Sequence, residues 1–392
     1  MTHAARFWFA ALLTLMPCSV PAQQPVIVGA VLTQSGILAD LAADLRKGLL
    51  LWQQEVNASG GLLERRVELR LLDDRSEAGA VRALYEQLIN EQRADVLIGP
   101  FGSAATLAAV GAAEANRRVL LNASGAASAT QRASHRYVFQ VPAAYGAYAR
   151  GLLEIARDLG YRRVLIAARN DPVAREMAEG AQADATTFGV QIVATEIHAA
   201  GSHDFAPAVG RAREAKAQAW IAFGLPQDAA EMVKTFRKLG YAPPLFAAQG
   251  VADAQFVKRV GQDAEYAMGV APWMASARTS GNAEFVQAYL RQWSAEPTAL
   301  AVQGFAAGKL LEQAVRRAGS LETEALRAAL SGLRGETPLG AYEVDSGGAQ
   351  RGAHPVVVQI QGGRREIVWP QALATAKWRL PYPRWEERRI AK

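Results

Sequence analysis

Short apolar runs alternate with helical patterns from residue 26 to residue 270 of this 392-residue chain. Runs such as "VIVGAVL" (26–32), "DVLIG" (95–99) and "AWIAFG" (219–224) are apolar throughout instead of at every second position. Strands of this composition are buried on both faces, which is typical of parallel sheets covered by helices. Between the runs, apolar residues spaced by three and four predict amphipathic helices. We therefore predict an α/β fold built from doubly wound parallel sheets.

The alternation falls into two successive blocks of similar layout, one within 26–141 and the other within 142–270. A chain of 392 residues exceeds what one compact core usually holds, so we expect two lobes. Helical patterns near 282–318 and 322–333 follow, and then two β-rich runs joined by "QGGR" (361–364), whose paired glycines predict a hairpin. These late elements must pack onto the two blocks, so the chain should cross between the lobes more than once.

The predicted division gives each lobe two stretches of chain. The first lobe comprises 26–141 plus about 271–335, the second comprises 142–270 plus about 336–370, and 371–392 form a basic tail. We see no long linker rich in proline, glycine or serine, so the lobes should sit close together. A cleft between them is the expected ligand site, because open parallel sheets bind ligands at the carboxyl ends of their strands.

The first 22 residues have the pattern of a cleaved signal peptide. Arg6 precedes an apolar stretch, 7–17, that is too short to span a bilayer, and small residues lead up to Ala22. We expect cleavage after Ala22 and export to the periplasm. The only cysteine, Cys18, lies in this segment; lipid attachment there is the alternative, and Pro17 argues against it. After cleavage, neither a disulfide nor thiol chemistry could contribute.

The positive charge of the chain does not indicate a nucleic-acid partner. The net charge is +6 and the isoelectric point is near 9.5, but Lys and Arg are scattered along the sequence. Nucleic-acid binding requires a focused basic surface. The one basic cluster, "PRWEERRIAK" (383–392), is interpreted as a solvated tail.

Motifs for catalysis, cofactors and metals are missing from the sequence. The first strand is not followed by G-x-G-x-x-G, and neither the phosphate-binding loop nor a G-x-S-x-G elbow occurs. His198 and His203 lack carboxylate or cysteine partners at a metal-site spacing. Asp73 and Asp74 are adjacent in an extended segment and so point to opposite faces, which favours a solvated turn. We expect no enzyme activity, no cofactor and no metal.

The segment "VLIGPFGSAATLAAV" (96–110) predicts a strand that ends in a bend and leads directly into a helix. Gly99 and Gly102 allow a tight bend, and Ser103 stands where the helix begins. The first amides of a helix lack partners and carry partial positive charge, so they can hold a carboxylate. Ser103 therefore either belongs to a ligand seat or only caps its own helix.

One strand later, "LLNASGAASAT" (120–130) repeats this design with Ser124, Gly125 and Ala126 at the corner. The carboxyl ends of neighbouring parallel strands meet at one edge of a sheet. Two such corners side by side favour a ligand seat, and "LTQSG" (32–36) after the first strand could be a third.

These stretches resemble periplasmic binding proteins of the branched-chain amino acid type, the extracytoplasmic receptors of ABC importers. The likeness begins with "VIVGAVLTQSG" (26–36) and "DVLIGPFGSAATLA" (95–108), continues through "FRKLGYAPPLFAAQG" (236–250) and "LRGETPLGAYEVD" (333–345), and covers essentially all of the mature chain. It implies two α/β lobes joined by three crossovers that close on a small ligand. It also implies membrane permease subunits as partners, and we expect a monomer.

The resemblance assigns the ligand carboxylate to the corner of Phe101, Gly102 and Ser103. The second corner matches Ser124 and Gly125, whereas a frequent threonine of the family is replaced by Ala126. Tyrosines that are common in amino acid receptors match the apolar residues Leu41, Val173 and Leu225, and the acid that binds the ligand ammonium group matches Gln249.

An ammonium ion in a closed cleft needs an acidic partner, because an unpaired buried charge is strongly destabilising. We therefore expect an organic acid or amide with an apolar or aromatic body in place of leucine, isoleucine or valine. A receptor that feeds an importer is the preferred function. An exported sensor domain of the same fold is the alternative, and an α/β enzyme lacks support from any motif.

Overall fold

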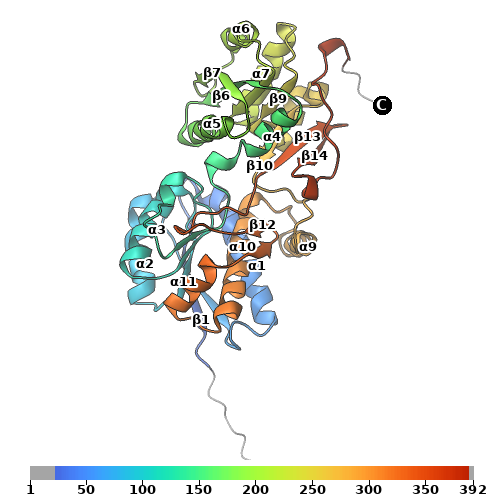
Figure 1. The fold of residues 1–392 in the computed structure, drawn as a ribbon. Helices are drawn as coiled ribbons and strands as arrows, with labels where there is room; N and C mark the ends of the chain where they lie inside the picture. The colour runs from blue at the N-terminus through green and yellow to red at the C-terminus, as the bar shows by residue number, and fades with distance from the viewer. Residues whose placement is uncertain (1–22, 388–392) are drawn as a thin grey trace, which may run out of the picture.

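The computed structural model describes residues 23–387 and shows two α/β lobes (Figure 1). The predicted signal peptide, with Cys18, lies outside the described residues, as do residues 388–392 at the other end of the chain. Among the described helices, none is long and apolar enough to cross a membrane.

The first lobe is built on a five-stranded parallel sheet in the order β2-β1-β3-β4-β5. Its strands are β1 (Val26–Val31), β2 (Val67–Leu72), β3 (Val96–Ile98), β4 (Leu120–Asn122) and β5 (Val138–Gln140). One face is covered by α2 (Val81–Asn90) and α3 (Ser103–Ala115), and the other by α1 (Ala39–Ala58), α9 (Asn282–Trp293), α10 (Ala299–Ala318) and α11 (Thr323–Ser331).

Helices α1 and α10 lie side by side although more than 200 residues separate them in sequence (Figure 1). Glycines permit this close approach. A Cβ atom on Gly48 would lie 1.8 Å from the carbonyl oxygen of Ala301, and one on Gly304 would lie 2.2 Å from that of Leu45. This packing fixes the late helical segment to the first block.

The second lobe is built on a seven-stranded sheet in the order β14-β13-β10-β9-β8-β6-β7. Its strands are β6 (Arg163–Arg169), β7 (Gln191–His198), β8 (Ala219–Phe223), β9 (Leu245–Ala248), β10 (Met268–Ala271), β13 (Val356–Gln361) and β14 (Arg364–Trp369). The faces are covered by α4 (Arg150–Asp158) and α5 (Pro172–Ala185) on one side and by α6 (Ala206–Glu214), α7 (Pro226–Lys238) and α8 (Ala254–Val260) on the other.

The predicted α/β fold with doubly wound parallel sheets is confirmed in both lobes. The late hairpin also forms, because β13 and β14 pair antiparallel around Gly362 and Gly363, both at positive φ. This hairpin extends the second sheet through the antiparallel pairing of β13 with β10.

The chain crosses between the lobes three times. It leaves the first lobe between β5 and α4, returns between β10 and α9, and leaves again between the short hairpin β11 (Gly335–Thr337)–β12 (Gly340–Tyr342) and β13. Tyr342 and Val344 are still part of the first lobe's core, so the third crossover follows residue 344.

The C-terminal segment lies against the second lobe. The carbonyl oxygens of Lys377 and Arg379 accept hydrogen bonds from Gln361 and Gln359, and Tyr382 is buried in the core of the lobe. The indole of Trp385 donates to the carbonyl oxygen of Tyr241 at 2.9 Å. The sequence-based interpretation of a solvated tail from residue 383 therefore does not hold as far as Trp385, because its aromatic side chain packs on the lobe.

Candidate functional site

The corner after β3 leaves the first turn of α3 uncapped. Gly102 occupies the N-cap position with φ of 82°, a conformation that favours glycine, and no described side chain caps the helix. Ser103 is the first helical residue rather than the cap. The free amides and the positive end of the helix dipole are therefore available to a carboxylate or carbonyl oxygen.

The hydroxyl of Ser103 lies where three parts of the molecule meet. Its oxygen accepts a hydrogen bond from the amide of Ala127 at 3.2 Å, and the Tyr145 hydroxyl lies nearby. Tyr145 follows the first crossover and packs against the core of the second lobe. Burial, together with nearby Glu176, raises the pKa of Tyr145, so its phenol stays protonated at neutral pH. No local sequence pattern points to this tyrosine, because it comes from a different segment of the chain.

The corner after β4 is hydrogen-bonded to the corner after β3. The Ser124 hydroxyl accepts from the amide of Gly102 at 2.8 Å and donates to the carbonyl oxygen of Pro100 at 2.9 Å. A Cβ atom on Gly125 would lie 2.4 Å from the hydroxyl oxygen of Thr106, so only glycine fits there. Ala126 is buried, and its carbonyl oxygen accepts from the amide of Tyr145 at 3.0 Å. Ser124 and Gly125 thus hold the seat in place through contacts within the protein.

The loop after β1 is held by Asp73. This carboxylate accepts from the Ser35 hydroxyl at 2.6 Å and from the amides of Gln34 and Arg75. Slight burial opposes ionisation, but these hydrogen bonds outweigh it and lower the pKa of Asp73 to about 2. Asp74 is buried and accepts from the amide of Ser76 at 3.0 Å. The expected solvated turn is therefore an ordered one.

Apolar side chains near this loop are exposed. Ile37, in the loop itself, is 92% exposed, and Leu41, in the first turn of α1, is 60% exposed. On the second lobe Leu225, which precedes α7, is 44% exposed. Val173 instead packs partly against the core of the second lobe at the start of α5, where Asp171 caps the helix. Phe101 likewise packs partly against the first lobe's core.

Gln249 follows β9 and is fixed by a neighbouring strand end. Its side-chain oxygen accepts from the amide of Gly224 at 3.2 Å. A backbone N–H can only donate, so the oxygen of the carboxamide must face Gly224 and the NH2 group must face away. No described residue accepts a hydrogen bond from that NH2 group. Gln249 therefore offers a donor, where an acid would offer acceptors.

A groove of about 970 Å³ lies between the lobes on the side of α8. Leu225, Gln249 and Gly250 line it from the second lobe, and 296–299, at the start of α10, line it from the first. Where α5 meets the first lobe, the lobes touch: the amide of Ser128 donates to the carboxylate of Glu176 at 2.7 Å. The structure thus brings Leu225 and Gln249 together, and separately brings Phe101, Gly102 and Ser103 together with Ser124, Gly125 and Ala126.

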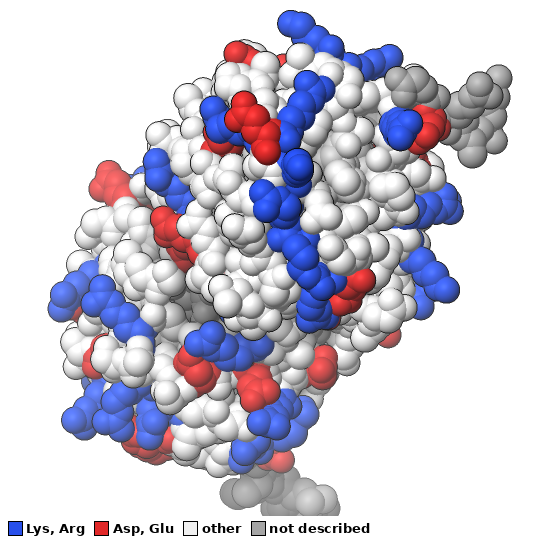
Figure 2. Space-filling view, turned by 45° about the horizontal axis from the view of Figure 1, so that its top comes forward, with Lys and Arg blue, Asp and Glu red and all other residues white. Residues whose placement is uncertain are grey.

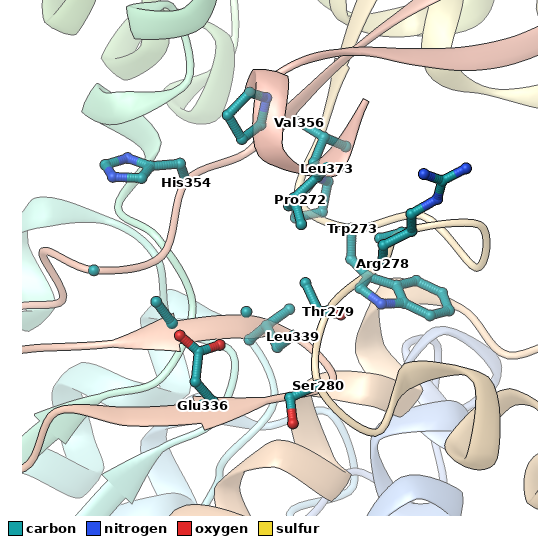
Figure 3. A pocket seen from close by; sticks show the side chains of 15 residues that line it. Pro272, Trp273, Arg278, Thr279, Ser280, Glu336, Leu339, His354, Val356 and Leu373 are labelled. Atoms are coloured by element: carbon teal, nitrogen blue, oxygen red, sulfur yellow. The ribbon is translucent and has the colours of Figure 1, made fainter. Parts of the chain in front are cut away.

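A smaller cavity of about 230 Å³ lies at the second and third crossovers (Figure 3). Leu339 lies below it, Val356 and Leu373 lie above it, and Trp273 closes one side (Figure 3). The indole of Trp273 is fixed by hydrogen bonds to Asn282 and the carbonyl oxygen of Pro338. Trp273 also lines the large groove, so this segment forms a wall shared by the two spaces.

Basic side chains on the face drawn in Figure 2 include a narrow line down the second lobe, with acidic side chains beside parts of it. Near the C-terminal ends of α7 and α8, Arg237 pairs with Asp263 at 2.6 Å and Lys234 pairs with Glu231 at 2.6 Å. Among the residues that the structure describes, no cluster of three or more His, Cys, Asp or Glu could hold a metal ion.

Two lobes with parallel sheets, joined by three crossovers and with a groove between them, define a two-lobed binding-protein fold. The family model for periplasmic binding proteins matches residues 25–364, and the chain belongs to this family. The Leu/Ile/Val-binding protein homolog 7 of Brucella abortus is 21% identical over 391 residues, which cover 93% of this chain and 96% of the relative.

Solved structures agree with this assignment. A branched-chain amino acid ABC transporter protein from Silicibacter pomeroyi superposes with a TM-score of 0.81 at 19% identity, covering 91% of this chain and 99% of that one. A solute-binding protein of R. palustris in complex with benzoate superposes with a TM-score of 0.67 at 22% identity, covering 90% and 98%. The same fold thus serves relatives described as amino acid transporters and a relative that holds an aromatic acid.

Proposed function

We propose that this chain is the periplasmic receptor of an ABC importer for a small organic acid or amide with an apolar body. The observation that carries the proposal is the orientation of Gln249. Its carboxamide oxygen faces Gly224, so its NH2 group is left to meet an acceptor on the ligand. An ammonium group at that point would meet another donor.

The carboxylate end of the ligand is assigned to the corner of Gly102 and Ser103. The start of α3 is uncapped and the Ser103 hydroxyl lies beside it. Charge-assisted hydrogen bonds from backbone amides are among the stronger ones in proteins, so this corner can bind an anion without a lysine or arginine. Phe101 precedes it and packs partly against the core of the first lobe.

The apolar body of the ligand is assigned to the surface between Leu41 and Leu225. Both side chains are large, apolar and exposed, and closure of the lobes around a ligand would bury such surface. Ile37 adds to this surface on the first lobe, and Val173 lies at the start of α5 on the second. A ligand with an alkyl or aromatic body gains from such closure.

Within this proposal the protein is exported by its signal peptide, acts as a monomer, makes no covalent change to the ligand and delivers it to membrane permease subunits. A sensor that reports occupancy to a partner is the alternative with the same fold. Deletion of the gene distinguishes the two functions. A receptor that feeds an importer is required for uptake of its labelled ligand, whereas a sensor is required only for the cell's response to that ligand.

A thermal-shift screen of the purified mature protein tests the ligand class. The panel contains aliphatic and aromatic carboxylic acids, their amides, and the corresponding amino acids. A ligand present at one hundred times its dissociation constant stabilises the fold by about 2.7 kcal/mol, which is readily detected. Acids or amides should give the largest shifts. Largest shifts from amino acids would contradict the proposal.

A further inference from the structure

A buried polar cluster lies at the carboxyl edge of the second lobe's sheet, beside Gln249. It consists of Arg169 at the end of β6, His198 at the end of β7 and Asp228 in the first turn of α7. Arg169 and His198 are paired in register on neighbouring strands, so their side chains leave the sheet on the same face. The Nη1 atom of Arg169 lies 3.5 Å from the carboxylate of Asp228.

Each member of this cluster has a buried polar atom without a hydrogen-bond partner among the described residues. These atoms are Nη1 of Arg169, Nε2 of His198 and Oδ1 of Asp228. An unsatisfied buried polar group is destabilising, so such groups are rare in folded proteins. Three of them in adjacent residues at the ligand-facing edge indicate a site that is completed by another molecule.

The contacts within the cluster leave these atoms free to pair elsewhere. Arg169 lies 3.4 Å from Asp171 and 3.5 Å from Asp228, distances beyond a good hydrogen bond. The other oxygen of Asp228 accepts from the amide of Leu225 at 2.8 Å and so keeps the carboxylate in place. The void between Asp228, Leu225 and Gly250 has no room for a water molecule, so a ligand group reaches Asp228 only if this region opens when the lobes close.

The backbone brings this cluster close to the groove. Gly224 lies between the two charged residues, because a Cβ atom there would lie 2.8 Å from Asp228 Oδ2 and 3.4 Å from the Arg169 Cβ. The same glycine binds Gln249, and Gly224, Leu225 and Gln249 all line the groove. Arg169 retains 20% of its side-chain exposure, although its Nη1 atom is buried and its side chain does not line the groove.

The cluster selects for a particular chemistry. Arg169 can only donate, and Asp228 as a carboxylate can only accept. The Nδ1 atom of His198 lies 3.2 Å from the carbonyl oxygen of Ala199, which can only accept, so Nδ1 carries a proton and Nε2 is the atom left to face a ligand. A second carboxylate on the ligand would be attracted by Arg169 but repelled by Asp228, and an ammonium group would be attracted by Asp228 but repelled by Arg169, so neither charge suits both residues. A neutral group that both accepts and donates satisfies both residues.

We propose that Arg169, Asp228 and His198 form a second-lobe subsite for a hydroxyl or primary carboxamide at the end of the ligand opposite its carboxylate. This inference rests on the proposed function and specifies its ligand: an acid with a neutral polar group at the far end of an apolar body. The ligand accepts from Arg169 and donates to Asp228 or His198 when the lobes close.

Calorimetric titration with matched probes tests the subsite. The probes are 3- and 4-hydroxybenzoate and 3- and 4-carbamoylbenzoate, each compared with the methylbenzoate of the same substitution, and 5-hydroxypentanoate compared with hexanoate. For the wild-type protein at least one polar probe should bind tenfold or more tightly than its apolar counterpart, as expected for a hydrogen bond to a charged group.

Variants test whether the preference for polar probes over methyl compounds arises from Arg169 and Asp228. Arg169→Met and Asp228→Asn should each reduce the tenfold preference to near one while the methyl compounds bind as before. Asp228→Asn keeps a carbonyl oxygen for the amide of Leu225, so it preserves the start of α7 if Arg169→Met does not fold. Arg175→Met is the matched control, since Arg175 is exposed on α5 and bonds only Asn170 in the described structure; it should retain the full preference.

The outcomes separate the subsite from the function on which it rests. Equal or tighter binding of the methyl compounds by the wild type, or a preference unchanged in Arg169→Met and Asp228→Asn, overturns the subsite while leaving the proposed function intact. If none of the acids binds and amino acids do, the proposed function fails as well.

Discussion

The amide of Gly224 donates a hydrogen bond to the side-chain oxygen of Gln249 at 3.2 Å. This contact joins the ends of β8 and β9 and turns the NH2 group of Gln249 away from the backbone. Because the orientation follows from what a backbone amide can do, the residue presents a donor to a ligand. The expected preference for acids over amino acids depends on this contact between Gly224 and Gln249.

Gln249→Glu should convert the site toward amino acids. A glutamate can still accept from the amide of Gly224 with one oxygen, but its other oxygen would repel a ligand acceptor and attract an ammonium group. The dissociation constant for a carboxylic acid ligand should rise by about tenfold or more, and leucine should gain affinity. Titration calorimetry measures both. Gln255→Glu, an exposed position on α8, adds the same charge and should change neither.

Ser103→Ala should weaken carboxylate binding by about tenfold, since it removes a hydroxyl at the seat and the link to Ala127. The dissociation constant of the best acid from the screen measures the effect. Ser128→Ala is a suitable comparison, because the contact of Ser128 with the second lobe uses its backbone amide. Equal affinity of Ser103→Ala and wild type would remove Ser103 from the site.

Gly125→Ala should destabilise the first lobe. The added methyl group would lie 2.4 Å from the Thr106 hydroxyl oxygen, which itself donates to the carbonyl oxygen of Gly102 at 2.8 Å. Overpacking of this kind is destabilising by about 1–3 kcal/mol. Gly111→Ala in α3 has no contact closer than 3.7 Å and should stabilise the helix by about 0.5–1 kcal/mol. Urea denaturation of the two variants should therefore shift in opposite directions.

Asp73→Asn should show a pH-dependent effect on stability. The pKa of Asp73 in the folded state is about 2, below its value in an unfolded chain, so its stabilising effect is complete above about pH 4 and is lost as the pH falls toward 2. The side chain is exposed enough for solvent to weaken these contacts, so we expect about 1 kcal/mol at neutral pH. Unfolding free energies of wild type and variant should converge on acidification. A difference that stays constant from pH 7 to pH 3 would contradict this role.

Much of the fold follows from local patterns in the sequence. Apolar runs mark most of the strands, and the paired glycines at 362–363 mark the late hairpin, because burial on both faces and positive φ each leave a local signature. The strands β5 and β10 are too short to give a recognisable apolar run in the sequence. The docking of Trp385 depends on contacts with residues more than 100 positions away, which no local pattern records.

The two strand-end corners were predictable from the sequence, but the contacts that their residues make were not. The corners at Ser103 and Ser124 follow from strand ends that lead into small residues. Their different roles appear only in the structure, where Ser124 bonds Pro100 and Gly102. Tyr145 and Arg169 come from the other lobe or its crossover, and their relation to the site depends on how distant segments meet.

The most direct test of the central claim compares leucine with 4-methylpentanoate, which has the same carbon skeleton and lacks the amino group. Titration calorimetry on the mature protein, at one pH and ionic strength, gives both dissociation constants. We expect the acid to bind at least tenfold more tightly, because Gln249 offers a donor where an ammonium group would need an acceptor. Tighter binding of leucine would contradict the claim that this cleft lacks an ammonium site.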